Sequence, residues 1–338
     1  MSLALELVRS AGRMAQLSIS ANLGRFRHWP SREVLIDEPL ALAEGKTSKL
    51  RRIYAKATAN MWDGPAVFRD AMQKHGGIQL EREKRIALSY PISMLMWGEL
   101  GAWIVSAELT ERLDDADARM AASSQVFDEA RHFYILRDYL AALHVPTPPL
   151  DPYFAAAARS LLADRDLTVK LLAMQILAEG TAQAIFSFLG DNHIEPVLSE
   201  ILPYIERDEA RHVGLGILHL PARVGRLAPA ERKRIARKIH GIGDLFAATQ
   251  VRYIKYYRQL GVEPQNLFRR ADRILCNLSG KLGNVPGTDQ PYFRTFDPDA
   301  PDYQRNLDRF MPPNGAPETP LSRLVNRVVE VGARFLPA

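Results

Sequence analysis

Acidic residues and histidines recur in this sequence at a fixed spacing. The pentapeptide Asp-Glu-Ala-Arg-His occurs at residues 128–132 and again at residues 208–212. Two isolated glutamates, Glu99 and Glu179, are separated by the same offset, so each precedes the Glu of its pentapeptide by the same distance along the chain. A five-residue match and an independent pair would rarely share one offset by chance, so we infer an internal duplication.

Each isolated glutamate lies in a long uncharged stretch. Glu99 is the only charged residue in residues 86–107, and Glu179 is the only one in residues 171–190. Stretches of this length could cross a membrane, but a helix that is apolar all round is also typical of the core of a helical bundle, which we favour because of the central carboxylates. A buried unpaired carboxylate is costly, so we expect each glutamate to be protonated, ion-paired or bound to a cation.

The distance from each isolated glutamate to its pentapeptide predicts two helical hairpins. If each glutamate lies level with its pentapeptide on an adjacent antiparallel helix, the turn falls midway between them. The sequence has a polar turn at residues 113–117, where Asp115 or Asp117 is a suitable N-cap, and a break at residues 190–196. On the second helix of each hairpin, Glu and His at positions i and i+3 share one face.

Two such hairpins would bring six metal ligands together inside the protein. They are Glu99, Glu129, His132, Glu179, Glu209 and His212. Four carboxylates and two imidazoles suit two iron ions, or one manganese and one iron, because hard oxygen donors balance the metal charge and imidazole suits iron. Ferritin-like di-iron bundles use this set, with one Glu on each of two helices and Glu-x-x-His on each of the others. Surface-exposed charged turns, the alternative, would leave both buried glutamates unexplained.

These motifs resemble the ligand motifs of the carboxylate-bridged di-iron oxygenases and oxidases, a ferritin-like superfamily. The resemblance covers about residues 80–260. Its nearest members are the ribonucleotide-reductase-like ligand-binding oxidases and the aryl-amine N-oxygenases, and it extends to bacterial multicomponent hydroxylases and acyl-carrier desaturases. It implies a four-helix bundle that holds two metal ions and uses O2 as a co-substrate.

The resemblance also implies roles for the residues around the ligands. In these proteins the aspartate before each ligating Glu hydrogen-bonds the histidine of the other half, so Asp128 would orient His212 and Asp208 would orient His132. Such bonds fix the imidazole and raise its basicity. The arginines that would hold these aspartates are Arg131 and Arg211.

Three departures distinguish this chain from individual families. The radical tyrosine of the reductase subunit would fall at Leu136. The crosslinked tyrosine and valine of the ligand-binding oxidases would fall at Met174 and Gly101, and the third histidine of the aryl-amine N-oxygenases at Ile205. The resemblance therefore implies the superfamily rather than a close copy of any of these three.

An apolar pocket beside the metals would keep the oxidant from water and aim it at a substrate. Side chains about one turn from Glu99 and Glu179 would line it, namely Leu95, Ala102, Trp103, Gln175, Ala182 and Gln183. We therefore predict an oxygenase or oxidase that hydroxylates, desaturates or N-oxidises a small, mainly apolar organic substrate through a peroxo or high-valent intermediate. An electron-transfer protein could supply electrons. The alternative is a ferroxidase or other iron-handling ferritin-like protein without an organic substrate.

Helices are expected throughout, because apolar residues recur at i, i+3, i+4 and i+7 along most of the chain. We predict a single all-α domain, a ferritin-like four-helix bundle with additional N- and C-terminal helices. Residues 1–79 would be a helical lead-in and residues 80–260 the di-metal bundle. Residues 261–338 would add a helix, a long loop arm at about 280–320 and a terminal amphipathic helix at about 321–335.

Composition narrows the compartment and the partners. The 338 residues include one cysteine, Cys276, which excludes an internal disulfide and a thiolate-rich metal site and favours a cytoplasmic location. The net charge of +5 is spread along the chain and does not indicate nucleic acid. Residues 1–17 and 321–335 mix apolar residues with arginine at helical spacing, which favours a homodimer or core-packing face and leaves weak peripheral membrane contact as an alternative.

Overall fold

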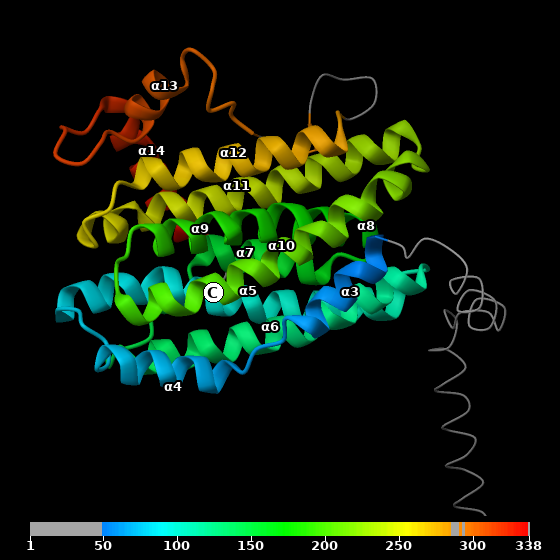
Figure 1. The fold of residues 1–338 in the computed structure, drawn as a ribbon. Coiled ribbons are helices and arrows are strands. Elements are labelled where there is room, and N and C mark those ends of the chain that lie inside the picture. The colour runs from blue at the N-terminus through cyan, green and yellow to red at the C-terminus, as the bar shows by residue number, and fades with distance from the viewer. Residues whose placement is uncertain (1–48, 285–290, 293–294, 337–338) are drawn as a thin grey trace, which may run out of the picture.

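The computed structural model describes residues 49–284, 291–292 and 295–336, and every regular element in these residues is a helix (Figure 1). The all-α prediction is confirmed. The first two described helices are α3 (Lys49–Ala59) and α4 (Gly64–His75). Residues 1–48, which include the amphipathic stretch at residues 1–17, lie outside the described residues.

Four long helical segments form the bundle. They are α5 (Arg82–Arg112), α6 (Ala116–Ala142), the segment Leu167–Asp191, and α10 (Pro196–Gly225). The third segment consists of α8 (Leu167–Leu172), the π-helical turn η2 (Ala173–Ala178) and α9 (Glu179–Asp191). Both turns fall where the spacing of the motifs predicts them, since Asp115 caps α6 by accepting a hydrogen bond from the Ala118 amide and α9 ends at Asp191.

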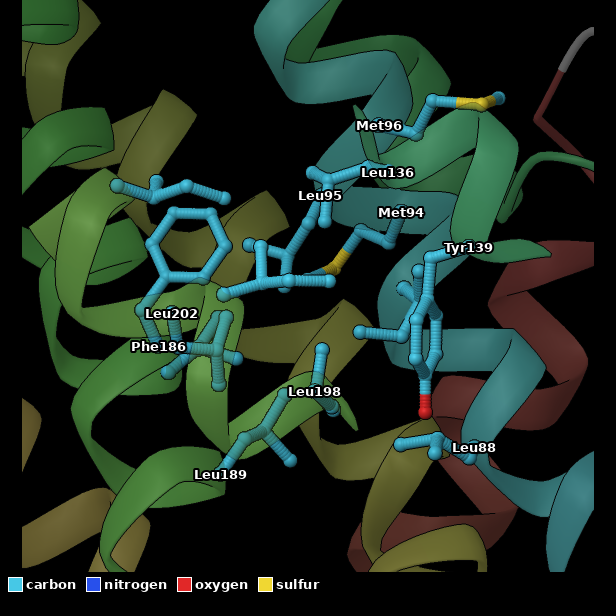
Figure 2. Close-up of a cluster of buried hydrophobic side chains, with 14 of the residues drawn as sticks. Leu88, Met94, Leu95, Met96, Leu136, Tyr139, Phe186, Leu189, Leu198 and Leu202 are labelled. Atoms are coloured by element: carbon cyan, nitrogen blue, oxygen red, sulfur yellow. The ribbon is translucent and has the colours of Figure 1, made fainter. Parts of the chain in front are cut away.

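Apolar side chains from α5, α6, α9 and α10 fill one end of the bundle (Figure 2). Leu88, Met94, Leu136, Phe186 and Leu202 belong to this cluster and are buried. Burying one such side chain contributes about 1.5–3 kcal/mol. The packing holds the four helices at fixed distances. A metal site needs this because its predicted ligands come from all four helices.

The segment Leu167–Asp191 is also the one helix in the described part of the chain that is long and apolar enough to cross a membrane. In the structure it packs inside the bundle, and 72% of its most apolar window is buried. Its apolar character is therefore explained by the protein core, the alternative that the sequence favours.

The remaining helices pack around the bundle. They are α7 (Pro152–Ala163), α11 (Pro229–Gln259), α12 (Pro264–Leu282), α13 (Tyr303–Phe310) and α14 (Pro320–Ala333). α11 packs on α5 and α7, and α12 packs on α9 (Figure 1). The division of the chain into a lead-in, a core and a C-terminal part stays a prediction.

The C-terminal arm differs from the expected loop. α12 extends into it as far as Leu282, and α13 forms within it. Tyr303 and Leu307, one turn apart on α13, are buried against Val251 and Ile254 of α11. This tertiary packing stabilises a short helix that the Pro-, Gly- and Asp-rich local composition does not favour.

Candidate metal centre

The six predicted ligands come from four helices and meet in the interior of the bundle. Glu99 lies on α5, Glu129 and His132 on α6, Glu179 on α9, and Glu209 and His212 on α10. All six are buried, with at most 4% of any residue exposed. The duplication has thus placed two equivalent sets of ligands face to face.

Their ligand atoms form two groups of four, and within each group the atoms lie within 4.8 Å of one another. One group is Glu99, Glu129, His132 and Glu209, and the other is Glu129, Glu179, Glu209 and His212. Glu129 and Glu209 belong to both groups. They are therefore placed to bridge two ions, while Glu99 with His132 and Glu179 with His212 would each complete one metal position.

Several of these atoms lack partners that a metal would supply. Glu129 Oε2, His132 Nδ1 and Glu209 Oε1 are buried and have no hydrogen-bond partner. His132 Nδ1 lies 3.1 Å from Glu209 Oε1, which is ion-pair distance without hydrogen-bond geometry, so these atoms converge on one region. A buried polar group left unsatisfied costs about 1–3 kcal/mol. Two divalent cations would satisfy this oxygen-rich and imidazole-containing set.

Crowding of the carboxylates changes their protonation. Burial, reinforced by the charge of Glu209, raises the pKa of Glu99 well above its usual value, and the same causes raise the pKa of Glu179. Burial would lower the pKa of His132, but its contact with Asp208 and with the neighbouring glutamates raises it well above its usual value. These shifts favour the protonated forms of Glu99, Glu179 and His132.

Each histidine is held from behind by the aspartate of the other half. His132 Nε2 lies 3.2 Å from Asp208 Oδ2, and His212 Nε2 lies 3.3 Å from Asp128 Oδ2. A carboxylate acceptor favours a proton on Nε2, which leaves the Nδ1 lone pair for a metal. In both rings Nδ1 faces the glutamates, as the 3.2 Å distance between His212 Nδ1 and Glu129 Oε1 indicates.

Each of the two arginines forms ion pairs with both aspartates. Arg131 Nη2 lies 2.5 Å from Asp128 Oδ1 and 2.7 Å from Asp208 Oδ2. Arg211 Nη2 lies 2.8 Å from Asp128 Oδ2 and 2.8 Å from Asp208 Oδ1. All four side chains are buried, and these contacts agree with the roles that the resemblance implies.

Solved structures with this architecture support the assignment of the fold. No protein-family model and no curated protein matches the sequence. An R2-like ligand-binding oxidase with an anaerobically reconstituted Mn/Fe cofactor is 16% identical, with a TM-score of 0.56 over 70% of this chain and 94% of that one. A variant R2-like ligand-binding oxidase with an Fe/Fe cofactor has the same values, and an R2-like ligand-binding oxidase without metal is 15% identical, with a TM-score of 0.55 over 70% and 97% of the two chains.

The chain has a ferritin-like fold. At this identity the likeness establishes the arrangement of the helices, and the chemistry has to be argued from the side chains themselves. Two further residues contact the centre, and neither was expected from the sequence motifs.

The first of these residues is Trp62, in the turn between α3 and α4. Its Nε1 donates a hydrogen bond to Asp208 Oδ2 at 2.7 Å, and its ring lies 4.4 Å from Cζ of Arg131. The ring also stacks on that of His132, with the centroids 6.2 Å apart. Trp62 precedes Asp208 by 146 residues, and no local pattern in the sequence connects them.

The second is Gln125, one turn before Glu129 on the same face of α6. Its Nε2 donates to Glu129 Oε1 at 2.8 Å and to Glu179 Oε1 at 2.6 Å. Its Oε1 accepts from Gln175 Nε2 at 2.8 Å. Since positions i and i+4 share a helix face, extending the ligand face by one turn would have found it.

A small apolar cavity of about 80 Å³ reaches Glu99 and Glu179. It is lined by residues of α5, α7, α9 and α11 and by part of η2. Of the six predicted pocket residues, Leu95, Ala102 and Ala182 line it. The structure places the other three predicted residues elsewhere.

Trp103 and Gln183 are not among the residues that line the cavity. Each lies four positions after a lining glutamate, Glu99 on α5 and Glu179 on α9, which is about 40° farther around a regular helix. On each helix the glutamate lies at the edge of the face that lines the cavity, so the residue one turn later falls beyond that edge.

Gln175 departs from the prediction for a different reason. It lies within the π-helical turn, where the extra residue per turn changes the direction of each side chain. It is fully buried and faces Gln125 instead of the cavity. Gln175 therefore supports a ligand-holding residue instead of lining the pocket.

Proposed function

We propose that this protein is an oxidoreductase that binds two iron ions, or one manganese and one iron, and uses O2 to oxidise a mainly apolar organic molecule. The observation that carries the proposal is the pair of four-ligand groups that share Glu129 and Glu209 and open on an apolar cavity. The Mn/Fe and Fe/Fe cofactors of the structurally similar R2-like ligand-binding oxidases support this choice of metals.

The bound metals would supply the electrons and the Lewis acidity needed to activate O2. The protein would hold them through the six ligands, while Asp128 and Asp208 fix the imidazoles and Gln125 fixes two carboxylates. Burial of all six ligands excludes bulk water, which strengthens the charge interactions at the centre.

The cavity would take the part of the substrate that reacts. Met94, Leu95, Phe154 and Ile185 are among its lining residues, so it favours a hydrocarbon over a charged group. Its contact with Glu99 and Glu179 would bring a substrate to the side of both metal positions. Hydroxylation, desaturation and N-oxidation all fit this arrangement.

The ferroxidase alternative has less support, because iron ions in transit need polar ligands along their path. Apart from Glu99 and Glu179, the residues that line the small cavity at the centre carry no carboxylate, so an ion that entered through it would have to cross an apolar stretch. An electron-transfer protein as the donor, a homodimeric state and a cytoplasmic location stay predictions.

Anaerobic titration with Fe(II) tests the proposal. We expect two iron ions per chain, followed by O2 consumption when air is admitted, and fewer than two in Glu129→Gln, because that carboxylate belongs to both groups. Glu206→Gln is the matched control, since Glu206 lies on α10 one turn before Glu209 but belongs to neither group. Uptake of fewer than two ions by the unmodified protein would contradict the proposal.

A further inference from the structure

A second cavity lies beside the one at the metal centre. Its volume is about 840 Å³, and its lining residues come from η2, α9, α11, α12, α13, the start of α14 and the neighbouring arm residues. Four residues line both cavities, Thr181 and Ile185 on α9 and Phe246 and Gln250 on α11. We call these four residues the throat, because they border both cavities.

The size and lining of the larger cavity indicate a ligand. Apolar side chains such as Leu177, Val251, Leu267, Phe268 and Leu275 contribute much of its wall. Small-molecule sites have volumes of about 300–1,000 Å³ and are mostly apolar with a few polar groups. An apolar space of this size next to a reactive centre is therefore best explained as a binding chamber.

The charged groups of this chamber are mostly acidic. The ionisable residues that line it are His240, Asp244, Asp272, Asp297, Asp302, Tyr303 and Arg309. Four carboxylates thus accompany a single guanidinium, which favours a cationic group over an anionic one. The throat residues, in contrast, carry no charge.

Asp272 is the most enclosed of these four carboxylates, since it is half-buried and the other three are exposed. Its Oδ2 accepts a hydrogen bond from the Tyr303 hydroxyl at 2.7 Å. That donor is neutral, so the contact leaves the negative charge of Asp272 in place. Burial raises the pKa of Asp272 to about 6, as expected for a carboxylate in a mainly apolar setting.

We propose that this chamber binds the organic substrate and that the substrate is an elongated apolar molecule with an amine at one end. The ammonium group lies at Asp272, and the hydrocarbon extends through the throat toward Glu99 and Glu179. The proposal rests on the proposed function for the oxidation that follows, but not for binding itself.

Three ligands of equal chain length, decylamine, decanol and decanoic acid, test the proposal by calorimetry under nitrogen. The full chain is used as isolated and again after treatment with a chelator. We expect decylamine to bind about tenfold more tightly than decanoic acid, since a charged hydrogen bond forms only with the amine. Tighter binding of decanoic acid would overturn the proposal.

Two glycines of α11 provide a matched pair that locates the binding site. Gly243 lines the chamber, and a Cβ there would meet Leu177 at 3.6 Å, an ordinary contact. Gly241 has open space around its Cβ position and does not line the chamber. Gly243→Trp should weaken decylamine binding at least about tenfold, and Gly241→Trp should not change it. Equal affinities in the two variants would place the ligand elsewhere.

Substitutions at and near Asp272 test whether this carboxylate binds the ammonium group of the ligand. Asp272→Asn should weaken decylamine about tenfold and leave decanol unchanged. Asp299→Asn is the control, because Asp299 lies in the same arm, pairs with Arg273 at 3.0 Å and does not line the chamber. Tyr303→Phe removes the competing donor and should maintain or strengthen decylamine binding. Loss of amine preference in Tyr303→Phe but not in Asp272→Asn would contradict the role of Asp272.

The two proposals fail in different ways. Binding of decylamine that depends on Gly243, without uptake of two metals, would leave the chamber intact and refute the di-metal function. Uptake of two metals with O2 consumption, but with decylamine binding unaffected by Gly243→Trp, would refute the chamber and leave the metal function intact.

Discussion

The two halves of the metal centre contain the same motif but are supported differently. In the first half α5 is a regular helix through Glu99, whereas in the second half the π-helical turn η2 directly precedes Glu179. Turns of this kind are frequent at functional sites, because they reorient side chains within a helix. The duplication has kept the ligands, and the surrounding residues have diverged.

Equivalent positions of the two halves differ where side chains contact Glu179 or the π-helical turn before it. Gln125 donates to Glu179, while Ile205 stands at the equivalent position of the second half. Gly216 lies against η2, where a Cβ would meet Gln175 Cβ at 2.7 Å, and its counterpart in the first half is the buried Leu136. The second metal position therefore depends on contacts that the first position lacks.

Removing Gln125 should have the largest effect on this difference. In Gln125→Leu, Glu129 and Glu179 each lose a hydrogen bond of 2.8 Å or less. Loss of an outer hydrogen-bond partner typically weakens metal binding by about 10–100-fold. In a competitive Mn(II) titration one of the two binding steps should weaken by about this factor and the other by less.

The control for this prediction is Ile205→Leu, at the equivalent position of the other half. It preserves the side-chain volume and should leave both binding steps unchanged. Equal weakening of both steps in Gln125→Leu would show that the two metal positions are not supported separately.

A methyl group at Gly216 should destabilise the protein by about 2 kcal/mol, through overpacking against η2. A Cβ there would lie 2.7 Å from Gln175 Cβ and 2.9 Å from Ile176 Cδ1. Gly214→Ala, on the same helix, is the control, because its Cβ would meet Ile53 at 3.5 Å, an ordinary contact. That change should be neutral or stabilising by up to about 1 kcal/mol. Urea unfolding measures both, and similar losses in the two variants would refute the close approach.

The metal affinity of the two halves should depend on pH in the same way. Glu99 and Glu179 both have a raised pKa, as do His132 and His212. A metal must displace these protons, so affinity should fall about tenfold per displaced proton for each unit of decrease in pH. Mn(II) titrations at several pH values measure this slope, and affinity that rises as the pH falls would contradict it.

The same groups determine the stability of the metal-free protein. A group whose pKa is raised by folding binds its proton more tightly in the folded state, so its stabilising contribution is lost as the pH rises through that raised pKa. The melting temperature after chelation should therefore decrease as the pH rises above the usual range of glutamate, while the Mn(II)-loaded protein should show the opposite trend.

The clustering of the six predicted ligands could be inferred from the sequence because it follows from register. A shared offset between the halves and a constant spacing within each half place Glu99 and Glu179 beside the Glu-x-x-His pairs once both halves are helical hairpins. The apolar runs indicated the core helices for the same reason. Three of the six predicted pocket residues do not line the cavity. A regular helical count does not apply to Gln175 in η2, and the lining face does not extend around the helix beyond Glu99 and Glu179 to Trp103 and Gln183.

Contacts between distant segments could not be predicted in this way. The packing of α13 on α11 and the position of Trp62 depend on tertiary structure, which a local pattern does not encode. The larger cavity has the same origin, since its walls come from segments far apart in the sequence, as Thr181 and Tyr303 are. These features can be identified only once the arrangement of the helices is known.

Substitution of Trp62 should have the smallest effect on metal affinity. It tests whether the two aspartates act separately, because Trp62 donates a hydrogen bond to Asp208. Asp208 also receives hydrogen bonds from His132 and Arg131. In Trp62→Phe the ring remains over Arg131, but one buried hydrogen bond is lost, which typically costs about 1 kcal/mol. Metal affinity at the position completed by His132 should fall by about fivefold or less, because the other partners still orient Asp208.

Phe127→Leu is the matched control for this change. The Phe127 ring lies 5.2 Å from Cζ of Arg131 on an exposed part of α6, so its replacement alters a contact of the same arginine without removing a hydrogen bond to the aspartate. A competitive Mn(II) titration should show weakening of one step in Trp62→Phe and of neither step in Phe127→Leu. Weakening of both steps in Trp62→Phe would mean that the ion-pair network transmits the loss to Asp128 and that the two halves act as one unit.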